Sequence, residues 1–228
     1  RLDVYLLSIV ILSCILVLYE KWEWLIVPLS VVAMLIHPGY VFMDINLLLV
    51  LLLYKVLSVP REKRKKYIVL LAVTFLVVSV LFLYFEFFSH PQDTEIYEEI
   101  VATAKSLSDN GQNYHDHLIN HDILGQNVFW DEWDWHIVNF IEFPIFLILF
   151  SPYIYLIGRF YWNLIKKEQE RTRRFAYIFI VMGAGTLLPE MVLKTDYGRY
   201  MFALIFYYIA CVLILLALGD EGATMRVK

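Results

Sequence analysis

The stretch KTDYGRYMFALIFYY, residues 194–208, places three charged side chains directly before an apolar run. Lys194, Asp196 and Arg199 fall on a short connection between two apolar segments, and Gly198 permits a tight turn there. In a structural interpretation, Asp196 and Arg199 pair with each other at a spacing of three residues. In a functional interpretation, Arg199 is oriented by Asp196 and binds a phosphate-bearing lipid, because a guanidinium fork matches phosphate geometry.

Carboxylates inside or at the rim of apolar segments form a second group, because a charge is costly to place there and usually faces a cavity or a partner. They are Asp44, Glu86, Glu142 and Glu190. Each one alone is explained equally well by helix capping or by a side chain that reaches the membrane interface. Together they predict a polar cavity on the side assigned below as outer, with His37, His136 and Asn139 at its wall.

Five of the six histidines occur in or beside residues 89–135, which form the one long connection in the chain. His115, His117 and His121 fall within seven residues. On a helix, His117 and His121 share a face at a spacing of four residues and could bind one metal ion with Asp116 or Asp122. No HExxH pattern or cysteine accompanies them, and a polar loop in contact with water explains the cluster as well. We therefore expect no bound metal ion, and no other cofactor.

The elements that would position these groups are apolar segments. The chain has 228 residues, of which 60% are hydrophobic, and a soluble domain rarely carries so much apolar material. We predict an all-α polytopic membrane protein with a single integral membrane domain, residues 1–228. About seven spans are expected, at residues 2–19, 24–37, 41–57, 67–88, 136–160, 175–193 and 200–218. The second and third could instead form a re-entrant hairpin.

The distribution of positive charge predicts the orientation in the membrane. With seven spans, fifteen of the nineteen Lys and Arg residues lie on one side, including the basic runs at 61–66 and 166–174. That side is expected to be cytoplasmic, so residues 89–135 face outward. We interpret the basic runs as topology signals, as contacts for anionic lipids or as a docking site for a protein partner, and not as nucleic-acid sites.

The outer loop at 89–135 is expected to be an ordered cap. Residues 94–107 have apolar positions at helical spacing and Thr94 as a plausible N-cap, which predicts a short amphipathic helix. Trp130, Trp133 and Trp135 come just before the fifth expected span and are typical of the aromatic belt at a membrane interface.

The run LLPEMVLKTDYGRYMFALI resembles a recurrent feature of the bacterial O-antigen and capsular polysaccharide polymerases, the Wzy-like group. In these proteins an aromatic turn with Asp, Gly and Arg follows a Pro-bearing helix end and precedes the final span. The turn here is Asp196-Tyr197-Gly198-Arg199-Tyr200. His37-Pro38-Gly39-Tyr40 also resembles an outer turn with a histidine in some of them. The members are usually longer, so this chain, which begins with Arg1, would be a trimmed or minimal one.

The resemblance implies glycan transfer between polyprenyl-diphosphate-linked sugars at the outer face of a bacterial cytoplasmic (inner) membrane, without a metal. Carried over by position, Arg199 would bind the phosphate groups, with Lys194 beside it, and Asp196 would orient Arg199. His37 would be a base or contact residue. Glu142 and His136 are the further catalytic candidates, and the rings of Trp130, Trp133 and Trp135 would contact the glycan.

Two other classes of function remain open. The first is a non-enzymatic membrane pore or a subunit of a larger assembly, which would need a ring of copies or a continuous polar stripe. The second is a transporter or flippase whose carboxylates relay protons, for which inverted repeats would be the sequence signal. We find neither a polar stripe nor an internal repeat in the sequence.

Overall fold

The computed structural model describes residues 2–88, 99, 102, 142–187 and 197–227, and over these residues the chain is helical throughout, without strands. This confirms the predicted all-α class. The elements in chain order are α1 (Leu2–Leu18), η1 (Glu23–Leu25), α2 (Ile26–Ile36), α3 (Tyr40–Met43), α4 (Ile45–Ser58), α5 (Arg61–Phe88), α9 (Glu142–Lys167), α10 (Arg171–Gly183), η3 (Ala184–Thr186), α12 (Tyr197–Ala217) and α13 (Glu221–Val227).

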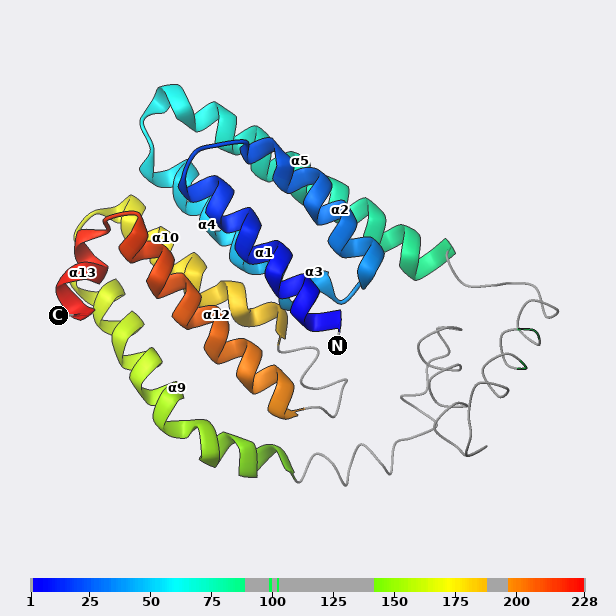
Figure 1. Ribbon diagram of the computed structural model, residues 1–228. Coiled ribbons are helices and arrows are strands. Elements are labelled where there is room, and N and C mark those ends of the chain that lie inside the picture. Colours follow the sequence, from blue (N-terminus) through cyan, green and yellow to red (C-terminus); the bar gives the residue numbers. More distant parts are fainter. Residues whose placement is uncertain (1, 89–98, 100–101, 103–141, 188–196, 228) are drawn as a thin grey trace.

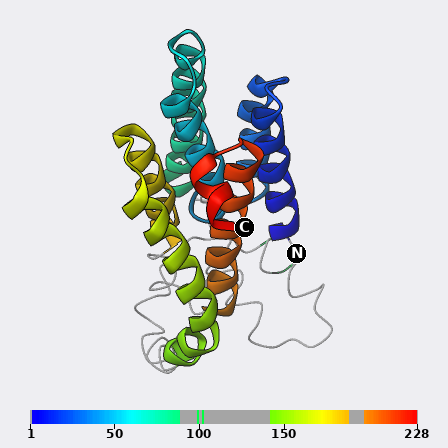
Figure 2. The same cartoon turned by 90° about the vertical axis from the view of Figure 1, so that its left-hand side faces the viewer.

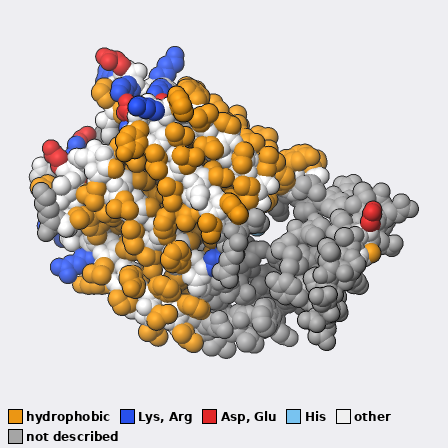
Figure 3. All heavy atoms as spheres, in the orientation of Figure 1, with side chains coloured by type: hydrophobic (Ala, Val, Ile, Leu, Met, Phe, Trp, Pro, Cys, Tyr) orange, Lys and Arg blue, Asp and Glu red, His pale blue; other side chains and the backbone are white. Residues whose placement is uncertain are grey.

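Among the residues that the structure describes, three helices are long and apolar enough to cross a membrane, which indicates a membrane protein. They contain the segments Arg61–Phe85, Phe143–Lys167 and Gly198–Ala217. The other expected spans contain shorter helices, of 17 residues in α1, 11 in α2, 14 in α4 and 13 in α10. Large apolar side chains on α5, α9 and α12 point outward, and Figure 3 shows hydrophobic side chains over most of the visible described surface. Such a surface is matched to lipid rather than to water.

Successive helices run in alternating directions, as Figure 1 shows for α1, α2, α4, α5, α9, α10 and α12. α4 lies at the centre and packs against α1, α5, α10 and α12. In the view turned by 90°, α12 and α13 lie between α9 on one side and α1 on the other (Figure 2). The ends of α1, α4, α9 and α12 therefore gather at one end of the bundle, together with the beginnings of α2, α5 and α10 (Figure 1).

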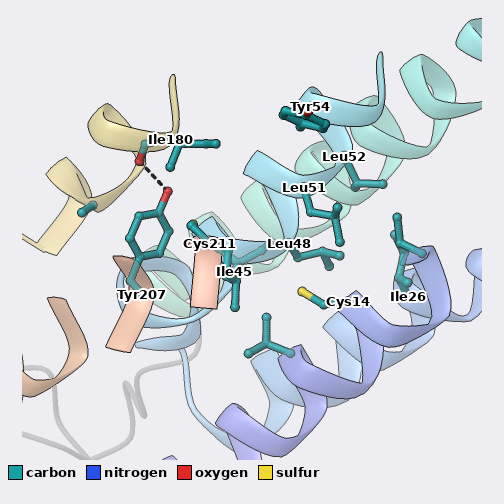
Figure 4. Close-up of a cluster of buried hydrophobic side chains, with 14 of the residues drawn as sticks. Cys14, Ile26, Ile45, Leu48, Leu51, Leu52, Tyr54, Ile180, Tyr207 and Cys211 are labelled. Carbon is teal, nitrogen blue, oxygen red and sulfur yellow. Dashed lines mark hydrogen bonds between the residues drawn. The ribbon is translucent and has the colours of Figure 1, made fainter. Parts of the chain in front are cut away.

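The core surrounds α4. Leu48, Leu51 and Leu52 are fully buried there, and Cys14 of α1 and Ile26 of α2 belong to the same cluster (Figure 4). Tyrosine hydroxyls add hydrogen bonds between helices at the other side of the core, where α12 meets α10. Tyr207 donates to the carbonyl of Ile180 at 2.9 Å, and Tyr208 donates to that of Val181 at 2.9 Å. In lipid, packing and such bonds carry much of the helix association, because burial away from water contributes little.

The third expected span, residues 41–57, is interrupted, contrary to our prediction of one segment. α3 ends at Met43 and α4 begins at Ile45, with Asp44 between them. The break frees the carbonyl of Phe42, which accepts from Asn46 Nδ2 at 2.8 Å and from Thr186 Oγ1 at 3.1 Å. The break is therefore tolerated because side chains satisfy the freed backbone group.

Two helices extend further than the expected spans. α5 begins at Arg61 rather than at residue 67, and α9 continues to Lys167 rather than ending at residue 160. The extension of α5 is polar, whereas the extension of α9 is largely apolar and ends in two lysines. These cations favour the negative end of the helix dipole. The expected helix at 94–107 and the rest of the loop at 89–135 lie outside the described residues, apart from Glu99 and Ala102.

Candidate lipid-binding crevice

A crevice of about 540 Å³ opens between α1, the α3–α4 junction and α12. Its volume falls within the usual range for small-molecule sites, about 300–1,000 Å³. α1 and the junction supply one wall and α12 supplies the other. The lining residues are Val4, Leu7, Val10, Met43, Asp44, Leu47, Arg199, Phe202, Ala203, Phe206 and Tyr207.

Two charged side chains, Asp44 and Arg199, line this mostly apolar crevice. Asp44 is half-buried at the break between α3 and α4, and Arg199 is exposed in the first turn of α12. The amide groups at a helix N-terminus carry a partial positive charge, which adds to the charge of Arg199. The site thus combines an apolar trough with a cation at one end, an arrangement that suits an amphiphile with an anionic head.

The α12 wall is one face of a helix. Arg199, Phe202, Ala203, Phe206 and Tyr207 follow one another at spacings of three, one, three and one residues, which brings their side chains to the same side. Of the α12 lining residues that follow Arg199, Ala203 has the smallest side chain, and Phe202, Phe206 and Tyr207 are aromatic. The methyl group of Ala203 leaves more room between the walls than an aromatic ring at this position would.

Tyr207, one of the lining residues, is held in place by the neighbouring helix. Tyr207 is buried, and its hydroxyl is fixed by the hydrogen bond to the Ile180 carbonyl (Figure 4). A β-carbon placed on Gly183 would collide with that hydroxyl and would come within 2.8 Å of Val50 Cγ2. Gly183 therefore lets α10 approach α12 and α4 closely, which fixes the position of Tyr207.

A second crevice, of about 290 Å³, lies on the opposite side of α12, against α9. Its lining includes Gly158 and Trp162 from α9 and Leu204 and Tyr208 from α12, and it contains no charged residue. A β-carbon on Gly158 would meet nothing within 4 Å. This crevice resembles the first in its walls, but it lacks a group that would recognise a polar head.

The structure brings together only part of the set that the sequence predicted. Arg199 and Asp44 line the same crevice. His37 does not line it: the residue ends α2 and is exposed, and its Nδ1 accepts a hydrogen bond from the Gly39 amide at 2.9 Å. This bond holds the turn between α2 and α3, so one ring nitrogen of His37 already has a structural role.

The remaining candidates are not described by the structure, either as whole residues or in their side chains. Glu142 begins α9 and Glu86 lies near the end of α5, but the structure describes only the backbone of each. The residues that lie wholly outside are His115, His117, His121, Trp130, Trp133, Trp135, His136, Asn139, Glu190, Lys194 and Asp196. Within the described ranges, no three His, Cys, Asp or Glu side chains come together as metal ligands.

Sequence reasoning missed the walls of the crevice. The α12 stripe was visible as an i, i+3, i+4, i+7 pattern that follows Arg199. The opposite wall, with Val4 and Leu7, had no comparable signal, because it is assembled from α1 and from the break at Asp44.

At the opposite end of the bundle, Asp220 is buried and has a structural role. Tyr54 and Tyr177 both donate their hydroxyls to its carboxylate, and the Ala223 amide donates to Oδ1 at 2.8 Å. Asp220 thereby caps the first turn of α13 and ties it to α4 and α10. All of its bonds are made within the protein, so we do not count it as a ligand site.

Comparisons of this chain with protein-family models, with curated proteins and with solved structures find no match.

Proposed function

We propose that this protein is a membrane-embedded glycan transferase or polymerase that acts on polyprenyl-diphosphate-linked sugars at the outer face of a bacterial inner membrane. The observation that carries the proposal is the crevice of about 540 Å³, with apolar walls and with Arg199 and Asp44 on its lining. An isoprenoid chain is apolar and its diphosphate is anionic, so the two parts of such a lipid match the two parts of the crevice. Only a part of a long prenyl chain would lie inside, and the rest would extend into the bilayer.

In this proposal, the distribution of Lys and Arg sets the orientation of the protein in the membrane. All seven expected segments span the membrane in this proposal, in the alternating directions that their helices have in Figure 1. Many cations lie at the end of the bundle opposite to Arg199. They include Lys55, Lys63, Lys66 and the run Arg171–Arg174. Because cytoplasmic loops are enriched in Lys and Arg, this distribution supports an outer position for the crevice.

The proposed reaction needs three kinds of group. A hydroxyl of the acceptor sugar attacks the anomeric carbon of the donor, the bond from that carbon to the phosphate oxygen breaks, and the diphosphate leaves with the electron pair. Arg199 and Lys194 neutralise the leaving diphosphate, and Asp196 orients Arg199. A base takes the hydroxyl proton, for which His37, Glu142 and His136 are the candidates. Trp130, Trp133 and Trp135 offer ring faces to the sugars.

The decisive experiment replaces Arg199 in the full chain. The host is one whose surface polymer depends on this protein. Arg199→Ala should reduce polymer roughly ten- to a hundredfold at an unchanged level of folded protein, since a charge-assisted hydrogen bond contributes about 1.5–3 kcal/mol. Arg199→Lys should recover only part of the activity, because the fork is lost. Asp196→Asn should have a smaller effect, because Asp196 orients and does not bind.

The structural interpretation of the same residues predicts a different result. If Arg199 only pairs with Asp196, both single variants lose a little stability, and the polymer made per folded molecule does not change. Unchanged polymer in Arg199→Ala would refute the proposed site. A flippase for the same lipid is the second candidate, since the crevice would serve it as well. Purified protein that elongates a lipid-linked oligosaccharide in detergent, where no membrane must be crossed, would exclude that candidate.

A further inference from the structure

The end of the bundle opposite to the crevice carries a second charged surface. It is made by the connection between α1 and α2, residues 19–25, and by the first turns of α5, residues 61–66. Figure 3 shows Lys and Arg side chains gathered over this end of the molecule. We call this surface the basic rim. We define it by its tryptophans and by its cations that do not pair with Glu20 or Glu23, which are Lys21, Trp22, Trp24, Arg61, Arg64 and Lys65.

The acidic side chains of the connection are engaged within the protein. Glu20 accepts from Lys55 Nζ at 2.9 Å and from Lys63 Nζ at 2.6 Å. Glu23 is buried and accepts from Lys66 Nζ at 2.6 Å. Three lysines therefore neutralise these two carboxylates and fix the connection against α4 and α5.

The four cations of the rim are in a different situation. Lys21, Arg61, Arg64 and Lys65 form no ion pair with any residue that the structure describes, and Glu62 is the one carboxylate in the stretch 61–66. The Nε of Arg64 is buried and has no hydrogen-bond partner among those residues. Arg64 as a residue is half-exposed. A half-exposed guanidinium that forms no ion pair within the protein is suited to an external anion.

The aromatic side chains of the rim indicate where that anion comes from. Trp22 and Trp24 are 78% and 51% exposed, although both residues are large and apolar. They flank Glu23, which accepts hydrogen bonds from Lys66 and Tyr67 near the beginning of α5. The apolar segment of α5 is long enough to cross a membrane. Exposed tryptophans at the end of a span are typical of the headgroup level of a bilayer. A soluble acidic partner would leave these rings unexplained.

We propose that the basic rim binds the headgroups of anionic phospholipids in the leaflet at this end of the bundle. Arg64 and the lysines contact the phosphodiester groups, and Trp22 and Trp24 lie among the upper acyl chains. The inference is independent of the glycan-transfer proposal, because it concerns the opposite end of the molecule and no residue of the crevice.

The test uses the purified full chain in a neutral detergent, with phosphatidylglycerol as the probe and phosphatidylcholine as its uncharged counterpart. Lipid retention is measured by native mass spectrometry, and the thermal midpoint is measured with each lipid. The rim variant replaces Lys21, Arg61, Arg64 and Lys65 by Gln. The matched control removes four exposed cations from the other basic run at the same end, namely Lys166, Lys167, Arg171 and Arg174.

The wild-type protein should retain phosphatidylglycerol over phosphatidylcholine, and the rim variant should bind it at least tenfold more weakly. The expectation follows because each Lys or Arg near an anionic surface contributes about a fivefold gain. Higher salt should weaken the wild-type binding. The control variant should keep most of the binding, and Trp22→Ala with Trp24→Ala should weaken it without any change of charge.

Retention in the rim variant equal to that of the wild type would overturn the proposal. An equal loss in the rim and control variants would also overturn it, since net charge alone would then explain binding. If the rim binds an acidic protein and shows no preference between the two lipids, its ligand is a protein partner and the lipid proposal is overturned. If the fourfold variant does not fold, Arg64→Gln alone serves, because it should still lower retention severalfold.

Discussion

The two ends of the bundle use their acidic residues in different ways. At the end that holds α13, Asp220, Glu20 and Glu23 each accept hydrogen bonds from several donors of the protein, and they tie helices together. At the other end, Asp44 and Arg199 line a crevice of about 540 Å³. A charge that borders an open apolar volume has room to meet a ligand, whereas a charge enclosed by protein donors stabilises the fold. The comparison teaches that the surroundings of an ionisable group separate a structural role from a binding role.

The largest effect on stability is expected at Asp220. Asp220→Ala leaves the hydroxyls of Tyr54 and Tyr177 without their acceptor and removes the cap of α13, so the free energy of unfolding should fall by about 3 kcal/mol. Thermal or denaturant unfolding in detergent measures this. Asp220→Asn keeps an acceptor oxygen and should cost less. If the comparison holds, activity per folded molecule stays unchanged, and a specific loss of activity would show that this end also takes part in function.

An effect on activity alone is expected when the crevice is filled. Ala203→Leu adds a branched side chain between the two walls and should lower polymer formation roughly tenfold by excluding the lipid chain, with a change in stability below about 1.5 kcal/mol. Gly158→Leu is the matched control, because it fills the second crevice, on the other side of α12. An equal loss of polymer formation in both variants would mean that the crevice with the charged lining is no more important for activity than the second crevice.

The smallest effect is expected at Glu20. Hydrogen bonds from Lys63 and Lys55 lower the pKa of the Glu20 carboxyl from 4.5 to about 2. The folded state then favours the ionised form, so the contribution to stability is complete above pH 4.5 and is lost as the pH falls toward about 2. Its size is small, because one third of the side chain is exposed and solvent screens the pairs.

Lys63→Gln provides the measurement for this carboxyl. Thermal midpoints recorded at pH 7, 4.5 and 3 should fall less steeply with acidification in the variant than in the wild type, since the largest cause of the shift is removed. Identical profiles would show that the pair is not formed in solution. The ion pair between Glu20 and Lys63 would then not contribute to the fold, contrary to the comparison of the two ends.

The sequence was most informative where local pattern and composition suffice. Long apolar runs identified α5, α9 and α12, because a helix needs about 20 apolar residues to cross a bilayer. It was less informative at helix breaks. The segment YVFMDINLLL has no Gly or Pro that would announce the interruption at Asp44, and Thr186, which helps to satisfy the freed carbonyl, lies far along the chain.

The sequence by itself determined the helical class, the membrane character and the concentration of cations at one end, since these depend on which residues occur and at what spacing. It also singled out Arg199, an arginine directly before a span on the less basic side. Only the tertiary structure decided that Arg199 faces Val4, Leu7 and Asp44 across a crevice, and that Tyr54 and Tyr177 converge on Asp220. The reason is physical: helical periodicity shows which side of a helix is apolar, but the partner of that side depends on packing between segments distant in sequence.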